Sequence, residues 1–145
     1  IGSLIFTNFI SRTGLPSDLV NFITELDLSN WMVIAIILLI YIVLGMVFES
    51  ISMVMLTVPI FYPLVQSLGF DLVWFGIVVV VVTEISLISP PVGLNVFVIS
   101  SVLPEVKTST IFKGVIPFFV LDILRLILLA TIPAISLFLP KLLYN

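Results

Sequence analysis

The sequence contains no cysteine and no histidine. The chain by itself therefore cannot form a disulfide, a Cys/His metal site, or a catalytic triad that uses either side chain. Charge is scarce as well, because 9% of the 145 residues are charged, against about 25% in an ordinary soluble domain. The net charge of −3 argues against nucleic-acid binding, which requires a basic surface.

Hydrophobic residues are abundant and make up 61% of the chain. So short a chain cannot hide that much apolar surface in a core of its own. We therefore expect the bilayer to be its solvent and the fold class to be an all-α polytopic membrane protein. The sequence opens with Ile1, with no initiator Met and no signal-peptide pattern, so we expect a C-terminal fragment of a larger membrane protein.

The first 30 residues are expected to hold the end of a membrane helix, residues 1–10, and a second short helix. Residues 17–27 carry apolar side chains on one face and polar side chains largely on the other. This pattern predicts an amphipathic helix at the membrane interface, with Ser17 as its N-cap. An ordinary connecting helix explains the same pattern.

Two apolar runs, 31–48 and 53–68, follow on either side of a short polar stretch, and Trp31 stands where an interfacial anchor is expected. Two full spans with a tight turn fit this pattern. A re-entrant helical hairpin over 31–68, with its tip inside the membrane, also fits and is favoured. The tip has a single charge, and the second run contains two prolines, as broken transporter segments do.

The stretch "EISLISPPVG", residues 84–93, predicts a discontinuous helix over 69–103 with its break at 89–93. Pro90 and Pro91 have no N–H, so they cannot bond the carbonyls of Ser86 and Leu87, which we expect to be unpaired. The first half-helix would point its partly negative end into the break, which suits Na⁺. The second would point its partly positive end there, which suits a carboxylate. A simple proline kink is the alternative.

Oxygen-bearing residues gather at the hairpin tip and at this break, and hard oxygen ligands suit Na⁺. Glu84 draws attention because a carboxylate inside a membrane segment is costly and by default indicates a functional site. Candidate cation-binding residues are Glu49, Ser50, Ser52, Thr83, Ser86, Leu87 and Ser89, with Thr57 supplying a further oxygen. Candidate substrate-binding residues are Pro91, Val92, Gly93 and Asn95, and Pro90 and Glu84 have a structural or coupling role.

The last part of the chain is expected to hold a polar loop over 104–114 and a membrane helix over 115–145. The helix should kink near Pro133 and end at Pro140. Asp122 and Arg125 lie three residues apart and should form a mutually neutralising ion pair.

The sequence "VVTEISLISPPVG", preceded by "GMVFESISMVMLTVPIFYPLVQSLGFDLVWFGI", resembles the large membrane subunit (M subunit, DctM-like permease) of tripartite ATP-independent periplasmic (TRAP) transporters. Three residues depart from the family pattern, with Thr83 in place of Asn, Ser86 in place of Gly, and Ser89 in place of Thr. The residues that match the pattern are Gly45, Glu49, Pro59, Pro63, Leu68, Gly69, Asp71, Glu84, Ile85, Leu87, Ile88, Pro90, Pro91, Val92 and Gly93.

The resemblance implies the second half of an inverted-repeat, elevator-type transporter, with a structural or coupling role for Gly45. It implies Na⁺-coupled import of a small organic anion, such as a C4-dicarboxylate or sialic acid, with no enzymatic step and no cofactor besides Na⁺. The implied partners are a small membrane subunit and a soluble periplasmic binding protein, and the implied location is the bacterial inner membrane. An ion-gradient-independent channel and a structural subunit of a membrane complex are the alternatives.

Overall fold

The computed structural model describes residues 2–90 and 93–144, and in this part all regular secondary structure is helical, with no strand. The helical fold class is therefore confirmed. Two of the described helices, α4 (Ser50–Ser67) and α7 (Thr108–Thr131), are long and apolar enough to cross a membrane. The described helices are α1 (Gly2–Thr13), α2 (Leu15–Glu25), α3 (Asn30–Gly45), α4 (Ser50–Ser67), α5 (Leu72–Ile88), α6 (Leu94–Val102), α7 (Thr108–Thr131) and α8 (Pro133–Tyr144).

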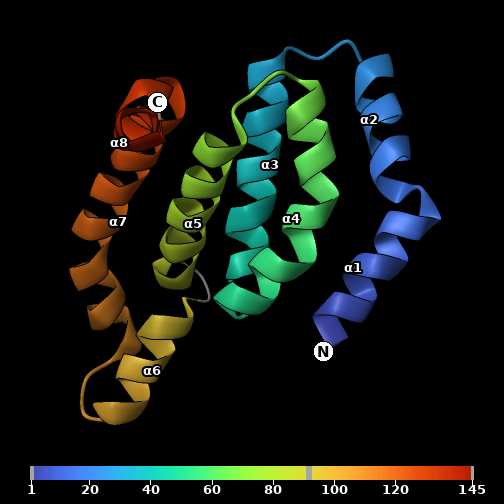
Figure 1. Ribbon diagram of the computed structural model, residues 1–145. Helices are drawn as coiled ribbons and strands as arrows, with labels where there is room; N and C mark the ends of the chain where they lie inside the picture. Colours follow the sequence, from blue (N-terminus) through green and yellow to red (C-terminus); the bar gives the residue numbers. More distant parts are fainter. Residues whose placement is uncertain (1, 91–92, 145) are drawn as a thin grey trace.

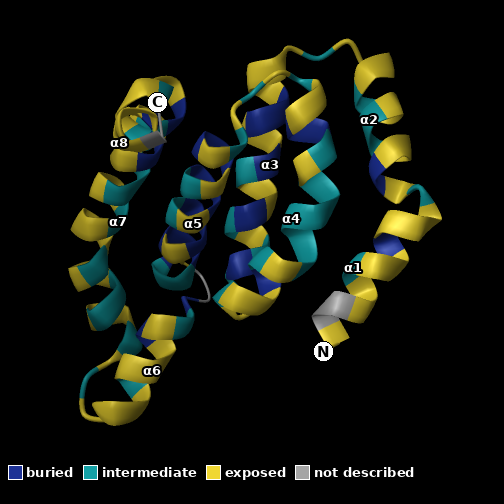
Figure 2. Ribbon diagram, viewed as in Figure 1, coloured by how far each residue is buried: buried dark blue, intermediate teal, exposed yellow. Residues whose placement is uncertain are grey.

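Helices α3, α4 and α5 lie side by side at the centre of the molecule (Figure 1). Helices α1 and α2 cover α4 on one side, and α7 and α8 pack against α5 on the other. The buried side chains concentrate on α3 and α5 (Figure 2). Tyr41 of α3 and Trp74 of α5 are the two largest fully buried side chains in the described part of the chain. The core therefore lies where the hairpin packs against the helix that carries Glu84.

The two arms of the hairpin are tied at the end opposite its tip. Helix α3 begins after Ser29, whose hydroxyl accepts the N–H of Met32 at 3.3 Å. In the first turn of α3, the Asn30 amide nitrogen donates to the carbonyl of Leu68 at 3.0 Å, where α4 ends. Because the last carbonyls of a helix have no partner within it, this bond satisfies one of them.

A second helix break, between α7 and α8, is closed by a side chain from α5. Pro133 has no N–H and so cannot donate to the carbonyl of Leu129, four residues earlier. The indole N–H of Trp74 donates to that carbonyl instead, at 2.9 Å. Trp74 also contacts Trp31 and Phe70, with ring centroids 6.3 Å and 5.1 Å away. This aromatic cluster joins the start of α3 and the start of α5 to the α7–α8 break.

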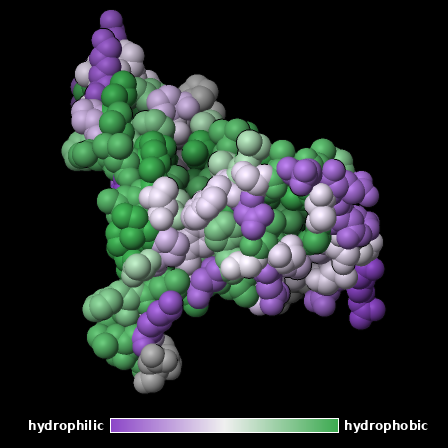
Figure 3. All heavy atoms as spheres, turned by 90° about the horizontal axis from the view of Figure 1, so that it is seen from above, coloured by the Kyte–Doolittle hydropathy of each residue, from purple (hydrophilic) through white to green (hydrophobic). Residues whose placement is uncertain are grey.

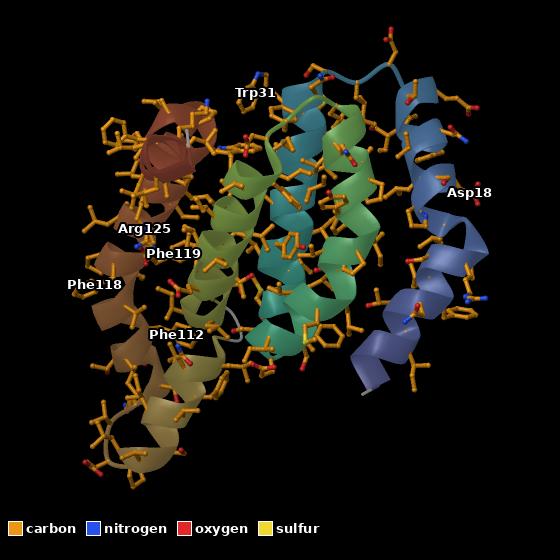
Figure 4. The ribbon with its side chains drawn as sticks, viewed as in Figure 1. Asp18, Trp31, Phe112, Phe118, Phe119 and Arg125 are labelled. Atoms are coloured by element: carbon orange, nitrogen blue, oxygen red, sulfur yellow. The ribbon has the colours of Figure 1, made fainter. Side chains whose placement is uncertain are left out.

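The outer surface of the described chain is strongly apolar. On α7, Phe118 points away from the molecule whereas Phe119 points toward α5 (Figure 4). Seen end-on, hydrophilic residues gather on the side of α2, where Asp18 points outward, and hydrophobic residues dominate the side of α7 and α8 (Figures 3 and 4). This distribution is what a lipid-facing surface requires.

Three expectations about helix ends were wrong. Ser17 is not an N-cap, because α2 already begins at Leu15; Gly14, with φ 75°, turns the chain there, and a proline is tolerated in the first helical turn. The polar loop expected over 104–114 is shorter, since α7 begins at Thr108. The final helix expected over 115–145 is interrupted where a kink was predicted, next to Pro133, but its expected end at Pro140 was wrong, because the second part, α8, continues to Tyr144.

Candidate functional site

The hairpin tip is organised by the carboxylate of Glu49, which caps α4. Its two oxygens accept the backbone N–H groups of Ile51 and Ser52 at 3.0 Å each, and the Ser52 hydroxyl at 2.9 Å. A negative charge at a helix N-terminus is stabilised by the helix dipole. Glu49 and Ser52 are both exposed, so their remaining lone pairs can still accept a ligand, although the carboxylate already serves α4.

The tip touches α5 at one closely packed point, Gly45 against Ser86. A methyl group at Gly45 would overlap the Ser86 hydroxyl and lie 2.6 Å from its Cβ. Both residues are buried, and Ser86 is 0% exposed. The Ser86 hydroxyl donates to the carbonyl of Thr83 at 2.5 Å, within its own helix. Gly45 therefore acts by leaving space for a side chain of α5.

The interruption between α5 and α6 lies beside this contact. Helix α5 ends at Ile88, Ser89 is extended with ψ 129°, and α6 begins at Leu94. Gly93 caps α6 with φ 53°, a left-handed conformation that favours glycine, and an added Cβ would come within 3.3 Å of the Ser89 carbonyl. Backbone geometry and close approach together therefore require glycine here.

One detail of the expected break was wrong. The carbonyl of Ser86 is not unpaired, because it accepts the N–H of Ser89 at 3.2 Å. A tighter last turn supplies the donor that the prolines lack, as is common at helix ends. Pro91 and Val92, both expected to bind substrate, lie outside the described residues.

A pocket of about 390 Å³ lies between α4 and α5 and brings four of the expected residues together. Glu84 lies in its wall with an exposed side chain, whereas Thr83 is buried and its hydroxyl donates to the Val79 carbonyl at 2.7 Å. The lining residues are Ser50, Ile51, Val54 and Met55 of α4 and Val80, Thr83, Glu84 and Leu87 of α5. The expected residues that do not line it are Gly45, Glu49, Ser52, Ser86, Ser89, Pro90, Gly93 and Asn95.

The sequence interpretation missed Tyr41. Its hydroxyl lies 2.8 Å from the Thr57 hydroxyl, which also donates to the Met53 carbonyl at 2.7 Å. Thr57, expected as one more oxygen of the site, therefore links the two hairpin arms near the tip. A lone tyrosine inside an apolar run was the available signal, because a buried Tyr hydroxyl usually has a partner on a neighbouring element.

The expected ion pair on α7 is confirmed. Arg125 Nη2 lies 3.2 Å from Asp122 Oδ1, and the two side chains are 49% and 30% exposed. The pair neutralises two charges within an apolar helix and takes no part in the pocket between α4 and α5.

The amino-acid sequence of the chain is similar to one family of known proteins over most of its length. Residues 1–135 match the family described as the tripartite ATP-independent periplasmic transporter, DctM component. The chain belongs to the DctM family. The family resemblance of the sequence is thereby confirmed, and the chain is part of a membrane protein.

Curated DctM relatives resemble nearly all of this chain. It is 35% identical to the C4-dicarboxylate TRAP transporter large permease protein DctM of Pseudomonas aeruginosa, over 96% of the chain and 32% of that protein. It is 29% identical to the sialic acid TRAP transporter large permease protein SiaM of Vibrio cholerae, over 98% of the chain and 33% of that protein. The isethionate permease protein DctMQ of Oleidesulfovibrio alaskensis is 30% identical over 92% of the chain. The chain spans about a third of the length of the first two.

Proposed function

We propose that this chain forms about a third of a TRAP large permease subunit, which imports a small carboxylate anion across the bacterial inner membrane with a Na⁺ gradient. The proposal rests on one observation above all. In a chain of the DctM family, Gly45 at the hairpin tip packs against Ser86 in the last turn of α5, next to the α5–α6 break.

In this proposal α3 and α4 form a re-entrant hairpin, and α5 and α6 form the discontinuous helix that opposes its tip. These four helices would belong to the second of two inverted repeats that move as an elevator. Helix α6 (Leu94–Val102) begins at the break. The partial positive charge at its N-terminus favours an anionic group there. The C-terminus of α5, with the oxygens of Ser86 and Ser89, favours a cation there.

The Na⁺ would be transported together with the anion, as cargo rather than as a resident cofactor. The chain offers it hydroxyl, carboxylate and carbonyl oxygens, which are hard ligands. Buried Ser86 and Ser89 supply oxygens on α5, and Ser50 supplies one from α4. Gly93, which caps α6, and Asn95, in its first turn, would bind the anion; Pro91 and Val92, which the sequence adds to this set, lie outside the described residues.

The relatives' names support the substrate class and the partners. C4-dicarboxylates and sialic acid both carry carboxylates, and both occur in the names of relatives. The name DctMQ suggests that a second membrane component is joined to the large permease in that protein. We therefore propose a small membrane subunit and a soluble periplasmic binding protein as partners, with transport and no enzymatic step.

The test is uptake into proteoliposomes that hold the complete transporter, with the binding protein and a radiolabelled carboxylate outside. Changing Pro90 and Pro91 together to alanine supplies the two missing N–H groups and allows a continuous helix. We expect Na⁺-driven uptake to fall at least tenfold while the amount of inserted protein stays unchanged. Pro140→Ala, a proline change inside α8, is the matched control and should leave uptake unchanged.

Three outcomes would contradict this proposal. Uptake that follows the substrate gradient equally well without Na⁺ would indicate a channel. A loss of recovered complex with normal turnover of the remaining transporters would indicate a structural subunit. Unchanged uptake by the double proline variant would remove the break from the mechanism.

A further inference from the structure

Glu84 differs from every other acidic residue in the central helices. Glu49 caps α4, and Asp71 accepts the N–H groups of Val73 and Trp74 at 2.8 and 3.0 Å. Asp122 is paired with Arg125. Within residues 2–90 and 93–144, the side chain of Glu84 has no hydrogen bond and no ion pair. Among the acidic residues that cap or lie within the described helices α3–α8, Glu84 is thus the one whose carboxylate has no partner; Glu105, in the exposed turn between α6 and α7, lies outside them.

The surroundings of Glu84 are mostly apolar, and the other polar side chains that line its pocket are the uncharged hydroxyls of Ser50 and Thr83. It follows five consecutive valines, 78–82, on α5 and borders the pocket of about 390 Å³ between α4 and α5. Ile51 and Met55 face it across the pocket from α4, and Leu87 lies one turn further along α5. The neighbouring Thr83 hydroxyl donates to its own helix and not to the carboxylate. An unpaired carboxylate in such a place is unstable against lipid and requires a positive or strongly polar partner.

The shape and charge of this pocket favour one kind of occupant. A lysine or arginine side chain has an apolar stem that would pack on the Ile51, Val54 and Met55 walls, with a cationic end that would reach the carboxylate. A carboxylate substrate would be repelled by Glu84, so the pocket does not suit the transported anion. In the described residues, none of the chain's own cationic groups lies within 4.0 Å of Glu84.

We propose that the Glu84 pocket receives a lysine or arginine side chain from the remaining two-thirds of the DctM subunit. This chain spans about a third of the length of its relatives, so a complete subunit supplies further membrane helices that can dock on α4 and α5. The resulting ion pair would hold the hairpin arm α4 and the discontinuous helix α5 against the rest of the subunit. The inference concerns assembly and does not depend on the proposed transport activity.

The test uses the complete transporter in native membranes, without any ion or substrate gradient. The photo-crosslinking amino acid p-benzoylphenylalanine replaces Ile51, which is 69% exposed in the Glu84 pocket. The matched control replaces Val43, which is 55% exposed in an apolar pocket of α3 that contains no charged residue. We expect the probe at position 51 to label a membrane helix of the same subunit, outside this chain, next to a lysine or arginine.

Charge dependence separates an ion pair from mere proximity. Glu84→Gln should lower the yield of the position 51 crosslink at least fivefold and leave the position 43 products unchanged, whereas Glu84→Asp should keep most of it. Exchanging the charges, with Glu84→Lys and the identified basic residue changed to Glu, should restore the crosslink. If the probe at 51 labels only phospholipid, only the small subunit, or a segment without a basic residue, the proposal is wrong. It is also wrong if the yield is the same with Gln at position 84. The mapping in the unmodified background decides the matter even if a Glu84 variant fails to accumulate.

Discussion

The hydrogen bond from Trp74 to the Leu129 carbonyl can be tested through the proline that makes it necessary. Trp74→Phe removes the indole N–H and leaves the carbonyl without a donor, because Pro133 cannot supply one. Hydrogen bonds between membrane helices contribute on average about 0.6 kcal/mol and at most about 1.7. The smaller ring also leaves a cavity at a site that is 0% exposed, so we expect a total cost of about 2–3 kcal/mol.

Pro133→Ala separates the two contributions. Alanine at this position offers an N–H to Leu129, one turn earlier, so the indole is no longer the only donor available. Trp74→Phe should then cost about 1 kcal/mol less in the Pro133→Ala background than in the parent. The cavity is the same in both backgrounds and cancels. Free energies of unfolding in SDS, followed by circular dichroism for the complete subunit, measure all four corners of this cycle.

The matched control is Trp31→Phe. Trp31 belongs to the same aromatic cluster but is 50% exposed, and its indole N–H has no bond within the described residues. Its substitution should cost less and should show no coupling to Pro133→Ala. A loss of unfolding free energy from Trp74→Phe that is the same in both backgrounds, within about 0.3–0.5 kcal/mol, would show that the indole does not replace the N–H missing at Pro133.

Two further predictions concern the hairpin. Gly45→Ala should lower the free energy of unfolding of the subunit by about 1–3 kcal/mol because the new methyl overlaps Ser86. Ser86→Gly in the same chain should recover most of that stability in SDS unfolding, and no recovery would show that the methyl clashes with another group. Tyr41→Phe and Thr57→Val should be non-additive by roughly 0.6 kcal/mol, since each removes the same 2.8 Å bond between the hairpin arms; strictly additive costs in a double-mutant cycle would show that this bond contributes nothing.

Proline and capping chemistry explains why much of the helix pattern could be predicted. The missing N–H groups of Pro90 and Pro91 act locally, so an interruption near them follows from the sequence alone. Helix α5 indeed ends at Ile88 and α6 begins at Leu94. Local rules fail where several local options exist. Ser17 is a good capping residue, but Gly14 turns the chain three residues earlier, and Pro140 interrupts hydrogen bonding without ending α8.

The candidate site could be predicted only as a set of residue types. Oxygen-rich stretches at 49–52 and 83–89 were visible in the sequence, but their pairings were not. The structure places Ser50 and Glu84 in one pocket, turns the Glu49 carboxylate back onto α4, and uses Thr57 to join Tyr41. These outcomes depend on how two helices rotate against each other, which composition and spacing leave open.

The sequence by itself determined that lipid surrounds this protein and where its helices are interrupted by proline. Hydrophobic excess and the backbone chemistry of proline are properties of single residues and short segments, so they need no partner. Only the tertiary structure decided which interruptions meet, that Ser86 fills the space left by Gly45, and that Trp74 replaces the donor missing at Pro133. These contacts, Gly45 with Ser86 and Trp74 with Leu129, join residues 41 and 55 positions apart in sequence, because packing brings together segments whose local patterns carry no information about each other.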